Sequence, residues 1–288
     1  MDPAMSAEID PLYAEARRVL LDALEALKPH LDAVIVVGAQ AVYLRTGPID
    51  ISVAPFTTDG DLALDPARLD GEPHLADVMG AAGFRLEPEE RPEPGIWITT
   101  RVIGGKDVDL PVDLIVPSDL ASKAGRRGAR LGPHGKVAAR KIPGLEAAIQ
   151  DNDVLKIEGI ADNDGRVVSA KVAGPTALLI AKAHKIQERL QNAARPDRVV
   201  DKDAGDVLRL MQTNDPENSA RVAARLMRDP QVGESSRLGI EFLVEQFRAS
   251  GSAGTLMAIN YYRGALPPNR VQAICTAFTA RLAEGTIE

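Results

Sequence analysis

Two aspartates flank a single glycine in the stretch TTDGDLALD, directly before an apolar run. Side chains of an extended strand alternate between its two faces, so Asp59 and Asp61 would share one face while Leu62 and Leu64 point to the other. Two carboxylates that close repel each other, and a Mg²⁺ ion bound by their oxygens relieves both charges. The alternative is an acidic turn, because Asp-Gly is a common turn dipeptide. The apolar strand that follows favours the metal site.

A third aspartate fits the same chemistry. In KDVDLPVDLIVP (106–117), valines and leucines alternate onto one face, which leaves Asp107, Asp109 and Asp113 on the other. We interpret Asp107 and Asp109 as solvent-facing. Asp113 lies in the most apolar part of the strand, where an isolated acid is expected to be paired with a cation or bound to a metal.

Cations with helical spacing could complement these acids. In residues 174–190, a helical period places three cations on one stripe and apolar residues on another. The cationic stripe consists of Leu178, Ala181, Lys182, Lys185 and Arg189, and the packing stripe of Leu179, Ala183, Ile186 and Leu190. Alone, such a stripe is typical of a solvated face, but opposite three carboxylates that hold metal and nucleotide it would contact phosphates.

Two aspartates follow on the next predicted helix. Asp203 and Asp206 are separated by one helical turn. They either orient Lys182 or Lys185, or they are surface acids.

A basic island interrupts an otherwise acidic chain. Residues 120–141 contain seven lysines and arginines and no acid, whereas the whole chain has a formal net charge of −7. The island is either a solvated glycine-rich loop or a clamp for phosphates or an RNA backbone. The overall negative charge argues against a protein that coats nucleic acid along its whole surface.

Composition limits the other possibilities. Cys275 is the single cysteine, which excludes an intramolecular disulfide and a cysteine-based zinc site, and the four histidines are scattered. Any metal must therefore be bound by oxygen. The sequence has no apolar run of about 20 residues and no secretory signal pattern, so we expect a cytoplasmic protein.

Periodicity and breaker residues predict the elements that must position these side chains. We expect a mixed α/β domain over residues 1–172 and a helical domain over residues 173–288 that contributes Lys and Asp residues to the cleft. The predicted helices are 10–28, 39–47, 74–83, 174–190 and 202–211, followed by about four more that are broken at Pro216, Pro230, Gly251 and Pro267. The predicted strands are 33–38, 61–65, 95–103, 106–117, 153–159 and 166–172, with a loop at 47–58.

Taken together, the motifs resemble the polymerase-β-type nucleotidyltransferase superfamily. The similarity lies in a strand that ends in glycine (VIVVGAQAVYL), the paired aspartates of TTDGDLAL and the single aspartate of PVDLIV. LLIAKAHKIQER and DKDAGDVLRL resemble the lysine and paired-aspartate helices of the abortive-infection and Men-type nucleotidyltransferase toxins of bacterial toxin-antitoxin pairs. The resemblance implies an α+β fold, with a mixed β-sheet flanked by helices and followed by a C-terminal helical bundle.

The resemblance also implies roles for individual residues. Asp59, Asp61 and Asp113 correspond to the metal ligands, and Asp113 would activate the acceptor hydroxyl. Lys182 and Asp206 match the later catalytic lysine and aspartate. The nucleotide-binding positions are Gly38, Ala39, Thr58, Lys182 and Lys185. The family has glycine or serine where Ala39 stands, so a hydroxyl donor is lost there, and no role follows for Arg45.

The predicted function is a Mg²⁺-dependent nucleotidyltransferase that moves a nucleoside monophosphate from an NTP to RNA. The toxin resemblance suggests the 3′ end of tRNA as acceptor, held through the basic segment 123–141, and an antitoxin protein as partner. The alternatives are transfer to a small molecule such as an antibiotic, and a non-catalytic binding protein on the same fold. The base of the NTP does not follow from the sequence.

Overall fold

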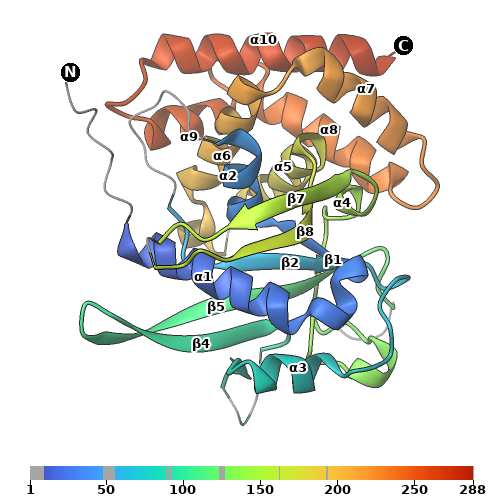
Figure 1. The fold of residues 1–288 in the computed structure, drawn as a ribbon. Coiled ribbons are helices and arrows are strands. Elements are labelled where there is room, and N and C mark those ends of the chain that lie inside the picture. The colour runs from blue at the N-terminus through green and yellow to red at the C-terminus, as the bar shows by residue number, and fades with distance from the viewer. Residues whose placement is uncertain are drawn as a thin grey trace.

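One mixed β-sheet forms the centre of the molecule (Figure 1). The computed structural model describes residues 10–47, 56–88, 90, 93–122, 127–161, 163–192 and 194–287. Within these ranges the strand order is β3-β4-β5-β2-β1-β8-β7, and β6 pairs with β5 outside this path. The strands are β1 (Val34–Val37), β2 (Gly60–Leu64), β3 (Arg85–Leu86), β4 (Ile96–Ile103), β5 (Lys106–Pro117), β6 (Arg140–Ile142), β7 (Asn152–Glu158) and β8 (Val167–Ala173).

Helices flank the sheet and then form a bundle beside it (Figure 1). The helices of the first half are α1 (Pro11–Ala26), η1 (Lys28–Ala33), α2 (Gly38–Thr46), α3 (Leu75–Ala81), η2 (Gly132–His134) and α4 (Ala147–Gln150). Those of the second half are α5 (Pro175–Gln191), η3 (Pro196–Arg198), α6 (Asp201–Thr213), α7 (Pro216–Met227), α8 (Gly233–Phe247), α9 (Ala253–Tyr261) and α10 (Pro268–Ile287). This arrangement confirms the predicted α+β class with a flanked mixed sheet and a C-terminal helical bundle.

The register of the central strands decides which residues are neighbours. β1 and β2 are antiparallel, with Val37 opposite Asp61, and β2 and β5 are parallel, with Asp61 beside Asp113. A Cβ on Gly60 would lie 3.3 Å from Leu20 of α1, so this position faces α1. Because side chains alternate along a strand, Asp61 faces away from α1, on the face opposite Leu62 and Leu64 that the sequence predicts for it.

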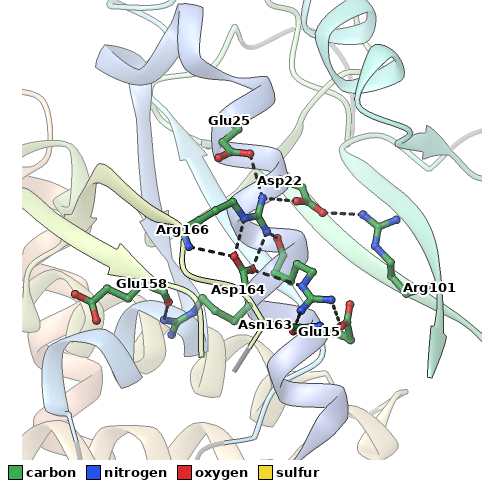
Figure 2. Close-up of polar contacts among 10 residues, drawn as sticks. Glu15, Asp22, Glu25, Arg101, Glu158, Asn163, Asp164 and Arg166 are labelled. Carbon is green, nitrogen blue, oxygen red and sulfur yellow. Dashed lines mark hydrogen bonds and ion pairs between the residues drawn. The ribbon is translucent and has the colours of Figure 1, made fainter. Parts of the chain in front are cut away.

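α1 is held on the sheet by a network of charged side chains (Figure 2). Asp22 accepts hydrogen bonds from Arg101 of β4 and from Arg166, each at 2.7 Å. Arg166 also donates to Asp164, with two N···O distances of 2.8 Å, and to Glu25 at 3.0 Å. One carboxylate of α1 therefore links two segments that lie far apart in the sequence.

The helical half is joined to the sheet half through α2. Arg209 of α6 donates from Nε to Thr46 Oγ1 at 2.7 Å and from its terminal nitrogen to the carbonyl oxygen of Gly47 at 2.5 Å. Its guanidinium also lies 5.3 Å from the ring centroid of Tyr43. Arg209 and Thr46 are both buried, so the end of α2 is fixed against α6.

Most predicted elements are present within a few residues of their expected bounds. The short elements β3, β6 and α4 were not predicted, because they are two to four residues long and lack a readable period. Most of the predicted loop at 47–58 lies outside the described residues, and the domain boundary near residue 173 stays a prediction. No described helix is long and apolar enough to cross a membrane.

The packing stripe of α5 differs from the prediction at its last position. Leu179, Ala183 and Ile186 are buried, but Leu190 is 40% exposed. Leu190 lies in the last turn of α5, which ends at Gln191. Helical period alone therefore extended the packing stripe one turn too far.

Replacement of Asp22 should weaken the attachment of α1. Asp22→Ala leaves the Arg101 and Arg166 guanidinium groups without their shared carboxylate, and we expect a loss of about 1–2 kcal/mol in the free energy of unfolding. Chemical denaturation measures this loss. Glu25→Ala is the matched control on the same helix, because the Glu25 side chain is 51% exposed and should contribute less than about 0.5 kcal/mol. Equal effects of the two substitutions would contradict the bridging role of Asp22.

Candidate functional site

The three predicted aspartates line one cavity of about 270 Å³ together with the cationic face of α5. Asp59 precedes β2, Asp61 lies on β2, and Asp113 lies beside Asp61 on β5. All five residues of the predicted α5 stripe line the same cavity: Leu178, Ala181, Lys182, Lys185 and Arg189. The sheet therefore supplies the three acids, here called the acidic wall, and α5 supplies three cations, here called the basic wall, together with the acid Glu188.

Burial and mutual repulsion act on the acidic wall. Burial, together with the negative charge of Asp59, raises the pKa of the Asp61 carboxyl. Burial and the charge of Asp61 raise the pKa of Asp113 to about 7, although Arg140 acts in the opposite direction. Both carboxylates would therefore gain from a cation placed between them.

A protein cation already contacts one of these acids. Arg140 of β6 forms an ion pair with Asp113 Oδ2. Asp59 instead accepts a hydrogen bond from the hydroxyl of buried Thr57. In their present positions, no group of three His, Cys, Asp or Glu side chains within the described ranges could hold a metal ion. The three aspartates share a cavity, but Asp113 is engaged by Arg140.

Gly38 brings the start of α2 against the acidic wall. Its φ is +67°, and a Cβ at this position would lie 1.9 Å from Asp61 Oδ2. The backbone of Gly38 therefore lies so close to Asp61 that a side chain at this position would clash with the carboxylate. Gly38 lines the cavity, whereas the neighbouring Ala39 is buried and does not.

Lys182 is buried in an ion-pair network and is not a solvated residue. Its Nζ donates to Asp203 Oδ1 at 2.9 Å and to Asp206 Oδ2 at 2.6 Å. Burial alone lowers the pKa of Lys182, but the charges of Asp203 and Asp206 outweigh burial and raise it above its usual value. The two acids are therefore orienting partners of Lys182 and not surface acids.

Asp203 gathers two further cations of the same helix face. Lys185 Nζ lies 3.2 Å from Asp203 Oδ1, and Arg189 forms an ion pair with Asp203 Oδ2. Burial raises the pKa of Asp203, but Lys182, Lys185 and Arg189 outweigh this effect and hold the pKa below its usual range. The Lys185 side chain is 44% exposed, so it presents its charge at the surface of the cavity.

Some lining residues did not follow from the sequence. Arg140 was only one cation of a basic island, and its contact with Asp113 depends on the pairing of β5 with β6. Arg198 of η3 also lines the cavity, and no motif marked it. Lys202 does not line the cavity, but it lies 3.7 Å from Asp206 and over the ring of Tyr43, and burial lowers its pKa.

Two other residues have places outside the cavity lining. Thr58 is partly buried beside Asp59 and does not line the cavity. Arg45 donates from Nε to the carbonyl oxygen of Ala173 at 2.8 Å and forms an ion pair with Asp153. Arg45 therefore ties α2 to the β7–β8 pair.

The basic segment is described from residue 127 onward, and residues 123–126 lie outside the described ranges. Arg140 reaches the cavity. Lys141 donates from Nζ to the carbonyl oxygen of Ser122 at 2.7 Å. Arg130 and Lys136 are exposed. The described part of the island thus has one end at the cavity and other cations at the surface.

No family model and no curated protein sequence matches this chain. Among solved structures, the chain is similar to an antigenic nucleotidyltransferase-like protein from Paracoccidioides brasiliensis, with 15% sequence identity and a TM-score of 0.42. The similarity covers 82% of this chain and 88% of that chain. A similarity of this extent assigns neither a reaction nor a site residue.

The close approach of Gly38 to Asp61 can be tested by adding one methyl group. Gly38→Ala combines a positive φ with a direct clash, and we expect a loss of about 3 kcal/mol or more in the free energy of unfolding. Gly83→Ala is the matched control, because Gly83 has a φ of +84° but open space around it and should lose only about 1 kcal/mol. Similar losses in a denaturant titration would contradict the clash.

The raised pKa of Asp61 predicts a stability that depends on pH. The folded protein holds the Asp61 proton more tightly than the unfolded chain does, so ionisation at rising pH opposes folding. In EDTA, Asp61→Asn should therefore be more stable than the wild type at pH 8, by about 1–3 kcal/mol. The advantage should shrink as the pH falls through the raised folded pKa, because the wild-type carboxyl then takes up a proton. Thermal melts across this range measure the difference.

Asp109→Asn serves as the control for this series. Asp109 lies on β5 and is exposed. Hydrogen bonds from Thr100 and Arg85 lower its pKa, so its replacement should bring no gain at pH 8. An Asp61→Asn variant that is less stable than the wild type at pH 8 would contradict the repulsion inferred for the acidic wall.

Proposed function

We propose that this protein is a nucleotidyltransferase that moves a nucleoside monophosphate from an NTP to a hydroxyl of RNA. One observation carries the proposal: three aspartates from two adjacent segments of the sheet and the cationic face of α5 line the same cavity. Phosphoryl and nucleotidyl transfer need positioned groups and charge neutralisation rather than a covalent intermediate on the protein. A cavity with opposed acidic and basic walls supplies both.

The carboxylate oxygens of the acidic wall have the chemistry that a divalent cation prefers, although the three side chains would have to move closer together to bind one ion. Asp61 and Asp113 have pKa values raised by burial and by neighbouring carboxylates, which is the repulsion that such an ion relieves. Asp59, Asp61 and Asp113 would hold Mg²⁺, and a second ion would be shared by Asp59 and Asp61. Bound Mg²⁺ would lower the pKa of the attacking hydroxyl and neutralise the charge of the departing pyrophosphate.

The residues of the chain have separable roles in this proposal. Lys185, Arg189 and Arg198 line the cavity and would bind the triphosphate oxygens. Lys182 already forms ion pairs with Asp203 and Asp206. It would therefore position the side chains of the basic wall and add positive charge behind them. Gly38 would let the phosphates approach the backbone at the start of α2.

The proposed reaction is a single displacement. The acceptor hydroxyl oxygen bonds to the α-phosphorus, and the bond from that phosphorus to the bridging oxygen of pyrophosphate breaks. The proton of the hydroxyl would pass to a carboxylate oxygen of Asp113, acting as general base.

The acceptor is proposed from charge and from the toxin resemblance. The described cations of the basic island extend from Arg140 at the cavity to exposed Arg130 and Lys136, a distribution suited to an RNA backbone. The toxin resemblance favours the 3′ end of tRNA and an antitoxin partner. Transfer to a small molecule is the second outcome that the assay below distinguishes.

The proposal is tested by incubating the protein with each α-labelled NTP, Mg²⁺ and total RNA. We expect label on RNA, enriched in tRNA, and a loss of about 100-fold or more in Asp61→Ala because the acidic wall loses a metal ligand. Asp109→Ala should retain transfer, because Asp109 lies on β5 but does not line the cavity. Label on small acceptors without RNA would replace the RNA proposal with the small-molecule one. No label from folded protein with any NTP would contradict nucleotidyl transfer.

A further inference from the structure

Arg140 is the single cationic side chain, within the described ranges, that forms an ion pair with any of the three cavity aspartates. The cations of the opposite wall are engaged elsewhere: Lys182, Lys185 and Arg189 all pair with Asp203. Arg140 thus occupies one of the three carboxylates that would hold a metal ion in the proposed function. The contact places one positive charge on Asp113 in the metal-free protein.

The backbone just before Arg140 is fixed by two hydrogen bonds. Gly95 N donates to the carbonyl oxygen of Val137 at 2.9 Å, and Trp97 Nε1 donates to that of Ala138, also at 2.9 Å. A Cβ on Gly95 would lie 2.6 Å from Arg140 N, so strand β6 packs directly on this turn. The side chain, and not the strand, is therefore the part of this segment that can change partner.

The guanidinium is only partly satisfied in its present position. Its terminal nitrogen contacts Asp113, but its buried Nε has no hydrogen-bond partner. An arginine that binds a carboxylate or phosphate through its full fork uses two parallel N–H donors. The side chain is 30% exposed and lines the cavity, so an anion in the cavity can be reached without movement of β6.

We propose that Arg140 is an exchangeable positioning residue, which occupies Asp113 until a divalent cation binds and then turns to the triphosphate of the nucleotide. This inference rests on the proposed function, since it assigns the order in which the same cavity is filled. Binding of the cation and of the nucleotide become coupled, because each favours the position of Arg140 that the other requires. Arg140 therefore weakens the binding of a metal ion alone and strengthens the binding of a metal ion together with nucleotide.

The first test measures Mn²⁺ binding to the nucleotide-free protein by electron paramagnetic resonance of the free ion. Arg140→Gln removes the competitor for Asp113 and should bind Mn²⁺ about 3- to 10-fold more tightly than the wild type. Lys141→Gln is the matched control, because it removes the same charge from the next residue of β6 while its Nζ contacts Ser122 and not the cavity acids. Lys141→Gln should change the affinity less than about twofold.

The second test measures nucleotide affinity with Ca²⁺ in place of Mg²⁺, by fluorescence of a labelled NTP. The same Arg140→Gln variant should now bind about 3- to 10-fold more weakly, because the triphosphate loses a contact. Arg140→Lys keeps the charge without the fork and should fall between the wild type and Arg140→Gln in both tests. It also provides the measurement if Arg140→Gln does not fold.

The outcomes separate this inference from the proposed function. Wild-type Mn²⁺ binding that is lost in Asp61→Asn but unchanged or weaker in Arg140→Gln overturns the role of Arg140 and leaves the metal site standing. Mn²⁺ binding that is equally absent from the wild type and Asp61→Asn overturns the metal site and the exchange with it. Opposite effects of Arg140→Gln on Mn²⁺ and nucleotide support the exchange, since a merely structural ion pair would not alter the two affinities in opposite directions.

Discussion

The parallel pairing of β2 with β5 places Asp61 and Asp113 side by side, and the rest of the site is arranged around the repulsion that follows. Two neighbouring carboxylates on adjacent strands, one buried and one partly buried, cannot both ionise at low cost without a nearby cation. Arg140 supplies a cation from β6, and α5 directs three more toward the same cavity. Gly38 completes the arrangement because only a residue without a side chain can pass Asp61.

In the basic wall, buried cations depend on nearby carboxylates, just as the carboxylates of the acidic wall depend on a nearby cation. Lys182 is buried with two carboxylates, and Asp203 in turn holds Lys185 and Arg189. Breaking such a buried pair leaves an uncompensated charge, so its members depend on one another. The cations of the basic wall are thus paired with carboxylates, whereas the acidic wall has one ion pair for three carboxylates, so a bound metal ion would supply the positive charge that it lacks.

Much of the site was predictable because it depends on local periods. Alternation along residues 106–117 predicted that Asp113 would lie on the face of the strand opposite the valines and leucines. Helical period predicted the face of α5 that lines the cavity. The partners that these residues contact were harder to predict from the sequence. The contact of Arg140 with Asp113 depends on a three-residue strand, and the depth of Lys182 depends on the packing of α6 against α5. Such contacts join segments distant in sequence and have no period of their own.

The hydrogen bonds from Arg209 to the end of α2 have a mechanical consequence. Arg209 fixes Thr46 and Gly47 at one end of the helix, and Gly38 stands at the other end against Asp61. A movement of α6 relative to the sheet would therefore move α2, a helix of nine residues, and with it the backbone beside Asp61. The helical bundle and the backbone beside the acidic wall are thus linked through a single helix, so a ligand that displaced α6 would also act on the position of Gly38.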